Sequence, residues 1–317
     1  MNTPLNQEKN QGSTHIYGMK NIASMNVTGW LDIEPPPPDW LVDELIHERT
    51  ISMLDGIGSV GKSYIAMQLA VAISSGEKWL DKWNCKKGKV LVINAEDPEP
   101  ECHRRFRRIA ENYDKETIRD AAKNIYYISI SNLPPEVMPN LVLMDTKFQP
   151  QQFFHYVAAI VKEIKPAAVI FDPLGSFVAV ENDNAYAAQI YALLQRLNTT
   201  IVVVHHNSKI AMSKKDAGIE DRAKSRGASN WVEKTKTRLY LRKLFMKIDK
   251  CNYNHELQDK ILQLEFKNGM FVAKSQFLTT NEEEEQIEEE IGKEKTTVGI
   301  PLTRLPKNYK TKKGGKK

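Results

Sequence analysis

The chain has 317 residues, of which 41% are hydrophobic and 27% charged, and its net charge is +5. This composition is typical of a globular protein whose core needs no disulfide or metal to hold it. Three widely spaced cysteines, Cys85, Cys102 and Cys251, predict a cytoplasmic, reducing location. No run approaches the roughly 20 apolar residues of a membrane-spanning helix, and the first residues lack the apolar segment of a signal peptide. We therefore expect no membrane partner, and the mild positive charge permits a polyanionic one.

The sequence predicts three regions. Residues 1–33 are polar and aperiodic, which predicts a flexible N-terminal arm, and four prolines at 35–38 begin the domain that we expect over residues 34–280. Residues 281–317 carry seven glutamates within 282–290 and seven basic residues within 304–317. Because blocks of like charge repel and bury little, we expect a charged disordered tail. A role of this tail in DNA affinity and a merely solubilising role both stay open.

In chain order, short apolar runs alternate with amphipathic stretches. The apolar runs predict strands at Thr50–Leu54, Lys89–Asn94, Ile125–Ile130, Ala168–Phe171 and Thr200–His205. The amphipathic stretches predict helices at Lys62–Ser75, Pro98–Tyr113, Gln151–Ile164 and Ala185–Leu197. This alternation predicts an α/β fold with a mostly parallel central sheet flanked by helices. From about residue 235 the pattern predicts antiparallel strands: Thr237–Leu241 alternates, and Leu262–Phe266 and Met270–Ala273 form a hairpin on an Asn-Gly turn.

The strongest motif is Gly56-Ile-Gly-Ser-Val-Gly61-Lys62-Ser63, which matches G-x-x-x-x-G-K-[ST] between a predicted strand and a predicted helix. Backbone N–H groups of such a loop converge on phosphate oxygens, the lysine reaches the β- and γ-phosphates, and the serine binds Mg²⁺. A glycine-rich turn without a ligand is the alternative. The motif predicts ATP and Mg²⁺ as cofactors and the following nucleotide-binding residues: Gly56, Gly58, Ser59, Val60, Gly61, Lys62, Ser63 and Tyr64.

Carboxylates end two of the predicted strands. Asp172 closes an apolar strand, as expected of a Walker B aspartate that helps to hold Mg²⁺ together with Ser63. Glu96 follows another strand and is our candidate for the base that polarises the attacking water, with Asp97 as a competing candidate. Asp97 stands immediately before Pro98, the expected first helical position, and there fits a helix cap better.

The fifth predicted strand ends in His205, and His206 follows it. These two histidines could hydrogen-bond a γ-phosphate, although a structural pair is the alternative. A charged stretch follows, at the sheet edge where ligands bind. Its lysines are candidates for nucleic-acid binding, with a solvated loop nearly as well supported: Lys209, Lys214, Lys215 and Lys224. Arg226 lies among small residues and could project into a neighbouring subunit's ATP site as an arginine finger.

Taken in order, these motifs resemble the RepA-type ATPases, RecA-like proteins that include a hexameric plasmid replicative helicase. The resemblance covers about residues 35–275, and only the combination of motifs is specific. It implies a RecA-like core in a homo-hexamer, with ATP between subunits and single-stranded DNA in the central channel. Carried over, Lys62 and Ser63 bind phosphate and Mg²⁺, and Asp172 is the Walker B acid. Glu96 becomes the base, His206 or His205 the γ-phosphate sensor, and Arg226 the finger.

The leading functional prediction is an ATP-driven motor on single-stranded DNA, a replicative helicase of a plasmid, phage or similar element. A nucleotide-switched DNA-binding or regulatory ATPase that does not unwind DNA is the alternative. A small-molecule kinase is less well supported, because the sequence shows no arginine-rich lid to close over a phosphoryl acceptor.

Overall fold

The computed structural model describes residues 26–130, 133, 141–181, 183–205 and 229–278. The chain divides into two units, Met1–Asp39 and Trp40–Lys317. In the first unit, a 3₁₀ helix, η2 (Thr28–Asp32), leaves Trp30 and Leu31 exposed. Most of the predicted arm and all of residues 281–317 lie outside the described ranges, so the arm and the tail stay predictions.

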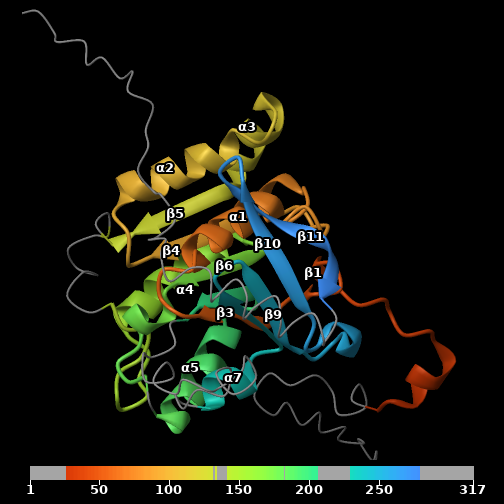
Figure 1. The fold of residues 1–317 in the computed structure, drawn as a ribbon. Helices are drawn as coiled ribbons and strands as arrows, with labels where there is room; N and C mark the ends of the chain where they lie inside the picture. Colours follow the sequence, from red (N-terminus) through yellow and green to blue (C-terminus); the bar gives the residue numbers. More distant parts are fainter. Residues whose placement is uncertain (1–25, 131–132, 134–140, 182, 206–228, 279–317) are drawn as a thin grey trace, which may run out of the picture. The chain divides into compact units, whose positions relative to one another are not determined.

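Within these ranges, the second unit contains a nine-stranded sheet in the order β11-β10-β9-β8-β3-β7-β6-β4-β5 (Figure 1). The strands are β3 (Ile51–Gly56), β4 (Val90–Asn94), β5 (Ile125–Ser129), β6 (Ala168–Asp172), β7 (Thr200–Val204), β8 (Thr237–Arg242), β9 (Phe245–Cys251), β10 (Ile261–Lys267) and β11 (Met270–Leu278). The neighbours β8, β3, β7, β6, β4 and β5 run parallel, whereas β9, β10 and β11 pair antiparallel. A separate small sheet joins β1 (Trp40–Val42) and β2 (Ile46–His47). The predicted fold class is thereby confirmed.

One strand agrees with its prediction on one edge only. The alternating pattern of Thr237–Leu241 predicts an antiparallel strand, and β8 does pair antiparallel with β9. On its other edge β8 pairs parallel with β3, and it is buried from Thr237 to Leu241. Its polar residues are buried with partners: Thr237 Oγ1 donates to the Leu45 carbonyl, and Arg238 is ion-paired. Strand β8 is therefore where the sheet changes from parallel to antiparallel pairing.

The predicted hairpin is confirmed. Strands β10 and β11 pair with Lys267 opposite Met270, and the turn between them is Asn268-Gly269. Both turn residues have positive φ, 51° and 80°, as the two central positions of a type I′ turn require.

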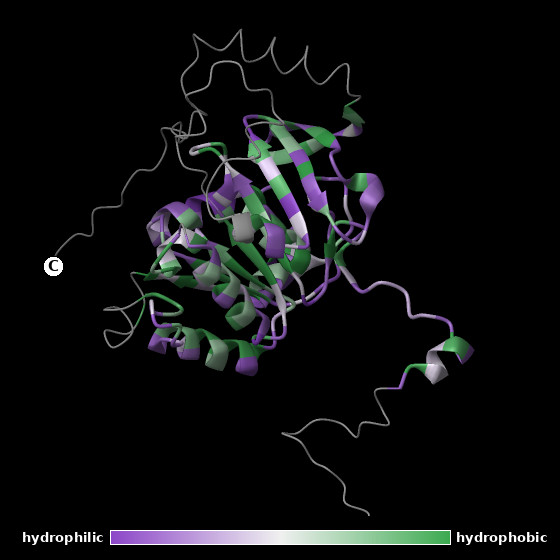
Figure 2. Ribbon diagram, turned by 90° about the horizontal axis from the view of Figure 1, so that it is seen from below, coloured by the Kyte–Doolittle hydropathy of each residue, from purple (hydrophilic) through white to green (hydrophobic). Residues whose placement is uncertain are grey.

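Helices cover both faces of the sheet (Figure 1). Alternate strand residues point to opposite faces, so Leu54 joins one core layer and Met53 the other. The first layer contains α1 (Lys62–Ser75), α2 (Glu99–Ala110) and α3 (Lys115–Asn124); the second contains α4 (Gln152–Ile164), α5 (Asn184–Gln195) and α7 (Ser229–Lys234). Figure 2 shows hydrophobic residues concentrated on the strands and on the helix sides that face them. None of the helices in the described part of the chain is long and apolar enough to cross a bilayer.

Helix α1 is the central helix of the first layer. It is buried on nearly every side, which only a predominantly apolar sequence tolerates. Gly61 at its N-cap and Gly76 at its C-cap both adopt left-handed backbone conformations, and the Gly76 N–H donates to the Ala72 carbonyl. The predicted bounds Lys62–Ser75 are therefore confirmed by the two glycines that limit the helix.

Candidate functional site

The loop between β3 and α1 is shaped by close approaches that only glycine permits. Gly56 has a φ of 149°, and a Cβ there would lie 2.3 Å from the Leu241 carbonyl oxygen of the neighbouring strand. Gly61 has a φ of 92°, and a Cβ there would lie 2.8 Å from the Phe271 ring. Between them, Gly58 and Ser59 are exposed and Val60 is buried. The loop thus opens outward at its middle and is held at both ends, as a phosphate-binding loop requires.

Lys62 starts α1, and its ammonium lies against the loop. Its Nζ donates to the carbonyls of Gly56 (2.9 Å) and Ile57 (2.6 Å). Burial lowers the pKa of Lys62 to about 8, against the opposing effect of nearby carboxylates. The side chain therefore carries its charge at neutral pH, inside a loop that would surround a phosphate.

Ser63 and Asp172 meet across the sheet edge. Ser63 Oγ donates to Asp172 Oδ1 at 3.1 Å, and Asn94 Nδ2 lies 3.5 Å from Asp172 Oδ2. Burial raises the pKa of Asp172 to about 6, because few charges compensate the desolvated carboxylate and the charges of Glu96 and Asp97 raise it further. A cation beside this carboxylate would remove much of that cost.

The turn Ala95–Pro98 carries Glu96 and is fixed on three sides. The Ala95 N–H donates to the Asp172 carbonyl at 2.9 Å, and the Asp97 N–H donates to Asn94 Oδ1 at 3.0 Å. Arg105 of α2 donates from both terminal nitrogens to the Asp97 carboxylate, at 2.6 and 3.1 Å. Glu96, exposed in this turn, acts electrostatically on both Lys62 and Asp172. The structure thus brings four predicted residues together: Lys62, Ser63, Glu96 and Asp172.

The interpretation of Asp97 as a helix cap is wrong. Helix α2 starts at Glu99, its N-cap is Pro98, and no side chain caps it. The Asp97 carboxylate instead accepts two hydrogen bonds from Arg105, in the second turn of the helix. A bidentate charged pair is stronger than a single bond to a backbone N–H.

This pair gives a first prediction. We expect Arg105→Ala to lower kcat for ATP hydrolysis about tenfold, because the turn that carries Glu96 loses a largely buried anchor of roughly 2 kcal/mol. The matched control is Arg104→Ala. Arg104 pairs with Glu101 at the surface, so this substitution should leave kcat within about twofold of the wild type. Steady-state kinetics of ATP hydrolysis gives kcat for both variants, once each is shown to be folded. Equal losses in the two would show that the Asp97 pair does not support the turn.

The β10–β11 hairpin forms a wall beside the loop. The Tyr64 hydroxyl donates to the Gly269 carbonyl, and the Tyr64 ring contacts Phe266 and Phe271 edge-on. Gln68 Nε2 donates to the Phe271 carbonyl and Gln68 Oε1 accepts from the Phe271 N–H, both at 2.9 Å. The Tyr64 side chain, predicted to bind nucleotide, therefore lies against the hairpin, and its contribution to a bound phosphate would come from its backbone.

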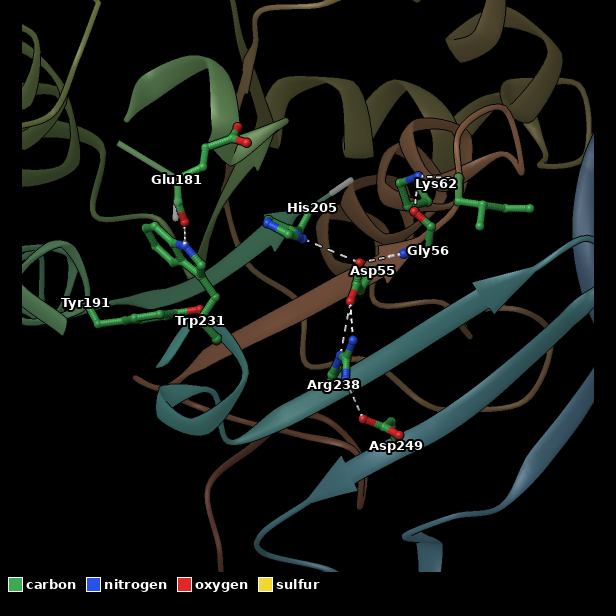
Figure 3. Close-up of polar contacts among 10 residues, drawn as sticks. Asp55, Gly56, Lys62, Glu181, Tyr191, His205, Trp231, Arg238 and Asp249 are labelled. Carbon is green, nitrogen blue, oxygen red and sulfur yellow. Dashed lines mark hydrogen bonds and ion pairs between the residues drawn. The ribbon is translucent and has the colours of Figure 1, made fainter. Parts of the chain in front are cut away.

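His205 lies directly after β7, beside the residue that precedes the loop. Its Nδ1 is 3.5 Å from Asp55 Oδ1 (Figure 3). The remaining candidates, His206, Arg226 and the lysines at 209, 214, 215 and 224, lie outside the described residues. Their predicted roles stay predictions.

Four residues at or around the site were not predicted from the sequence: Asn94, Asp55, Arg238 and Arg105. Asn94 was counted only as a strand residue, although a polar side chain at the end of an apolar strand is itself a signal. Asp55 and Arg238 are charges within apolar strands, and Asp55 precedes the loop directly. A charge in a strand that is buried on both faces predicts a buried ion pair.

The phosphate-binding loop lies between a central parallel strand and a buried helix, and it faces carboxylates that follow or end two neighbouring strands. This arrangement is that of a P-loop ATPase. A family model described as an AAA domain matches residues 21–212, more than half of the sequence, and the chain belongs to this family.

The solved structures with a similar fold include the following two. One, described as an ATPase domain, aligns with a TM-score of 0.50 at 14% identity, over 72% of this chain and 85% of that one. A KaiC-like protein from the hyperthermophilic archaeon Pyrococcus horikoshii OT3 aligns with a TM-score of 0.48 at 14% identity, over 75% of this chain and 95% of that one. At this identity, the likeness to the solved ATPase domain concerns the fold.

Proposed function

We propose that the chain is an ATP-hydrolysing motor on single-stranded DNA, a RepA-type replicative helicase of a plasmid, phage or similar element that works as a homo-hexamer. The observation that carries the ATPase part is the gathering of Lys62, Ser63, Glu96 and Asp172 at one sheet edge. The DNA part is supported by the order of motifs along the sequence and by the basic stretch that follows His205.

The residues present fit Mg²⁺ with ATP. Ser63 Oγ and the Asp172 carboxylate are oxygen donors 3.1 Å apart, the ligand type that Mg²⁺ prefers. Ser63 would bind the cation directly and Asp172 through water, as in other phosphate-loop enzymes. When bound, Mg²⁺ neutralises charge on the β- and γ-phosphates. The loop amides and the Lys62 ammonium would hold the same phosphates from the other side.

The reaction then needs a water in line with the γ-phosphate. Glu96 would accept a proton from this water, since its turn is anchored to the strand that bears Asp172. His205, or His206, would contact the γ-phosphate and report its loss to the chain that follows. Arg226 of an adjacent subunit would stabilise the charge of the transition state.

The test is steady-state ATP hydrolysis with and without single-stranded DNA, for the wild type and for Lys62→Ala. We expect DNA to stimulate hydrolysis severalfold and the substitution to abolish it, because the buried ammonium lies directly against the loop. Stimulated hydrolysis leads to strand displacement on a forked substrate, where unwinding supports a helicase. Hydrolysis that ignores DNA would favour a nucleotide-switched regulatory ATPase, and ATP binding without hydrolysis would contradict the role of Glu96.

A further inference from the structure

A buried carboxylate stands behind the phosphate-binding loop. Asp55 is fully buried at the end of β3, directly before Gly56. Its Oδ1 accepts the Gly56 N–H at 2.7 Å, which fixes the first peptide of the loop. The same oxygen lies 3.5 Å from His205 Nδ1, so one oxygen atom faces both the loop and the candidate sensor (Figure 3).

Rigid elements hold Asp55 and His205 in place. The His205 N–H donates to the Leu54 carbonyl at 2.9 Å, which continues the parallel pairing of β3 with β7. The His205 side chain is mostly buried, at 19% exposure. At 3.5 Å the side-chain contact is long for a hydrogen bond. Contacts of this kind tighten when an active site fills.

The second carboxylate oxygen of Asp55 is paired with Arg238, which neutralises the charge of Asp55. Asp55 Oδ2 accepts from Arg238 Nε at 3.1 Å and also from Arg238 Nη2. Arg238 is itself buried and donates from Nη1 to Asp249 on β9 at 2.7 Å. The pKa of Asp55 is lowered: burial opposes ionisation, but His205 and Arg238 outweigh it. The carboxylate is therefore a charged, two-sided acceptor at neutral pH.

We propose that Asp55 is a positioning residue, which sets the phosphate-binding loop and the His205 imidazole in one hydrogen-bonded unit while Arg238 balances its charge. This inference rests on the proposed function, since it assigns His205 a place beside the γ-phosphate. Asp55 itself touches no substrate in this arrangement. Its effect passes through Gly56 on one side and through His205 Nδ1 on the other.

The test compares two double variants that share the loss of charge and differ in the acceptor oxygen. Asp55→Asn with Arg238→Gln keeps an oxygen that can accept from Gly56 and His205, and Asp55→Ala with Arg238→Gln removes it. We expect kcat in the alanine pair to be at least about tenfold below that in the asparagine pair, with KM for ATP differing less than about threefold. Equal kcat values, or a loss that follows the folded fraction measured by circular dichroism, would overturn the proposal.

A single substitution separates this role from general disturbance of the ion network. Asp249→Asn removes the other carboxylate partner of Arg238 and leaves Asp55, Gly56 and His205 unaltered. We expect kcat within about twofold of the wild type. If Asp249→Asn lowered kcat as much as Asp55→Ala with Arg238→Gln does, the effect would come from disturbing the buried Arg238. That result would contradict the positioning role of Asp55.

A measurement on the wild type keeps the proposal testable if the double variants do not fold. Long-range ¹H–¹⁵N spectra of histidine-labelled protein at alkaline pH report which ring nitrogen carries the proton of a neutral imidazole. We expect His205, assigned by the loss of its signals in His205→Gln, to carry it on Nδ1. The opposite tautomer would overturn the proposal. Because this readout needs no ATP hydrolysis, it stays informative even if Lys62→Ala and the wild type prove equally inactive.

Discussion

Substitution of Glu96 by Gln is expected to lower kcat for ATP hydrolysis between about a hundred- and ten-thousandfold, the usual contribution of a general base. The change removes the proton acceptor but keeps the length of the side chain, and Glu96 is exposed, so the fold should be unaffected. ATP affinity should stay within about threefold, because the loop and Lys62 bind the phosphates. Single-turnover hydrolysis and equilibrium binding of a fluorescent ATP analogue measure the two quantities separately.

The control for this experiment is Asp97→Asn, since Asp97 is the competing base. Both oxygens of its carboxylate accept from Arg105, so it is poorly placed to take a proton from water. We expect a loss of about tenfold, through the weakened turn. A larger loss in Asp97→Asn than in Glu96→Gln would reverse the assignment of the base.

Substitution of Asp172 by Asn is expected to abolish Mg²⁺-dependent hydrolysis and yet to stabilise the nucleotide-free protein at alkaline pH. Burial raises the pKa of Asp172 to about 6, above its unfolded value. The stability that this group contributes is therefore fully present at low pH and is lost as the pH rises through about 6. The shift of about 2 pH units corresponds to ~3 kcal/mol.

Urea unfolding of the nucleotide-free wild type and of Asp172→Asn, at about pH 4.5 and about pH 8, tests this linkage. The stability of Asp172→Asn relative to the wild type should rise between the two pH values by a large part of this amount. Ser63→Ala removes the hydroxyl that donates to Asp172. This variant should therefore show a steeper pH dependence of the free energy of unfolding than the wild type. A relative stability that does not change with pH would contradict the raised pKa.

Local signals explain which parts of the fold could be predicted. Helix α1 was predicted to the residue because glycines at 61 and 76 mark both ends, and the hairpin because Asn268-Gly269 dictates its turn. The parallel pairing of β8 with β3 could not be predicted, since β3 lies far away in the sequence. Helix α3 and strand β9 were missed, although Asp114 caps α3 with bonds to two backbone N–H groups.

The same distinction between local signals and long-range pairing decides which residues of the candidate site could be predicted. Residues whose role depends on a motif, such as Lys62 and Asp172, could be named from the sequence. Residues whose role depends on a pairing between separate elements could not, and Asp55, Arg238 and Arg105 belong to this class. Asp97 shows the limit most clearly, because a local rule favoured a cap and a partner eight residues away took the carboxylate instead.

The bonds from α1 to the hairpin bear on the order in which the protein is completed during synthesis. Tyr64 and Gln68 take their partners from Gly269 and Phe271, which are 205 and 203 residues later. The Phe271 ring that lies against Gly61 also belongs to β11. When only the first half of a nascent chain has emerged from the ribosome, the whole phosphate-binding motif is present. The β10–β11 hairpin, against which α1 packs, has not yet been made. Nucleotide binding should therefore appear late on the ribosome, once β11 has emerged.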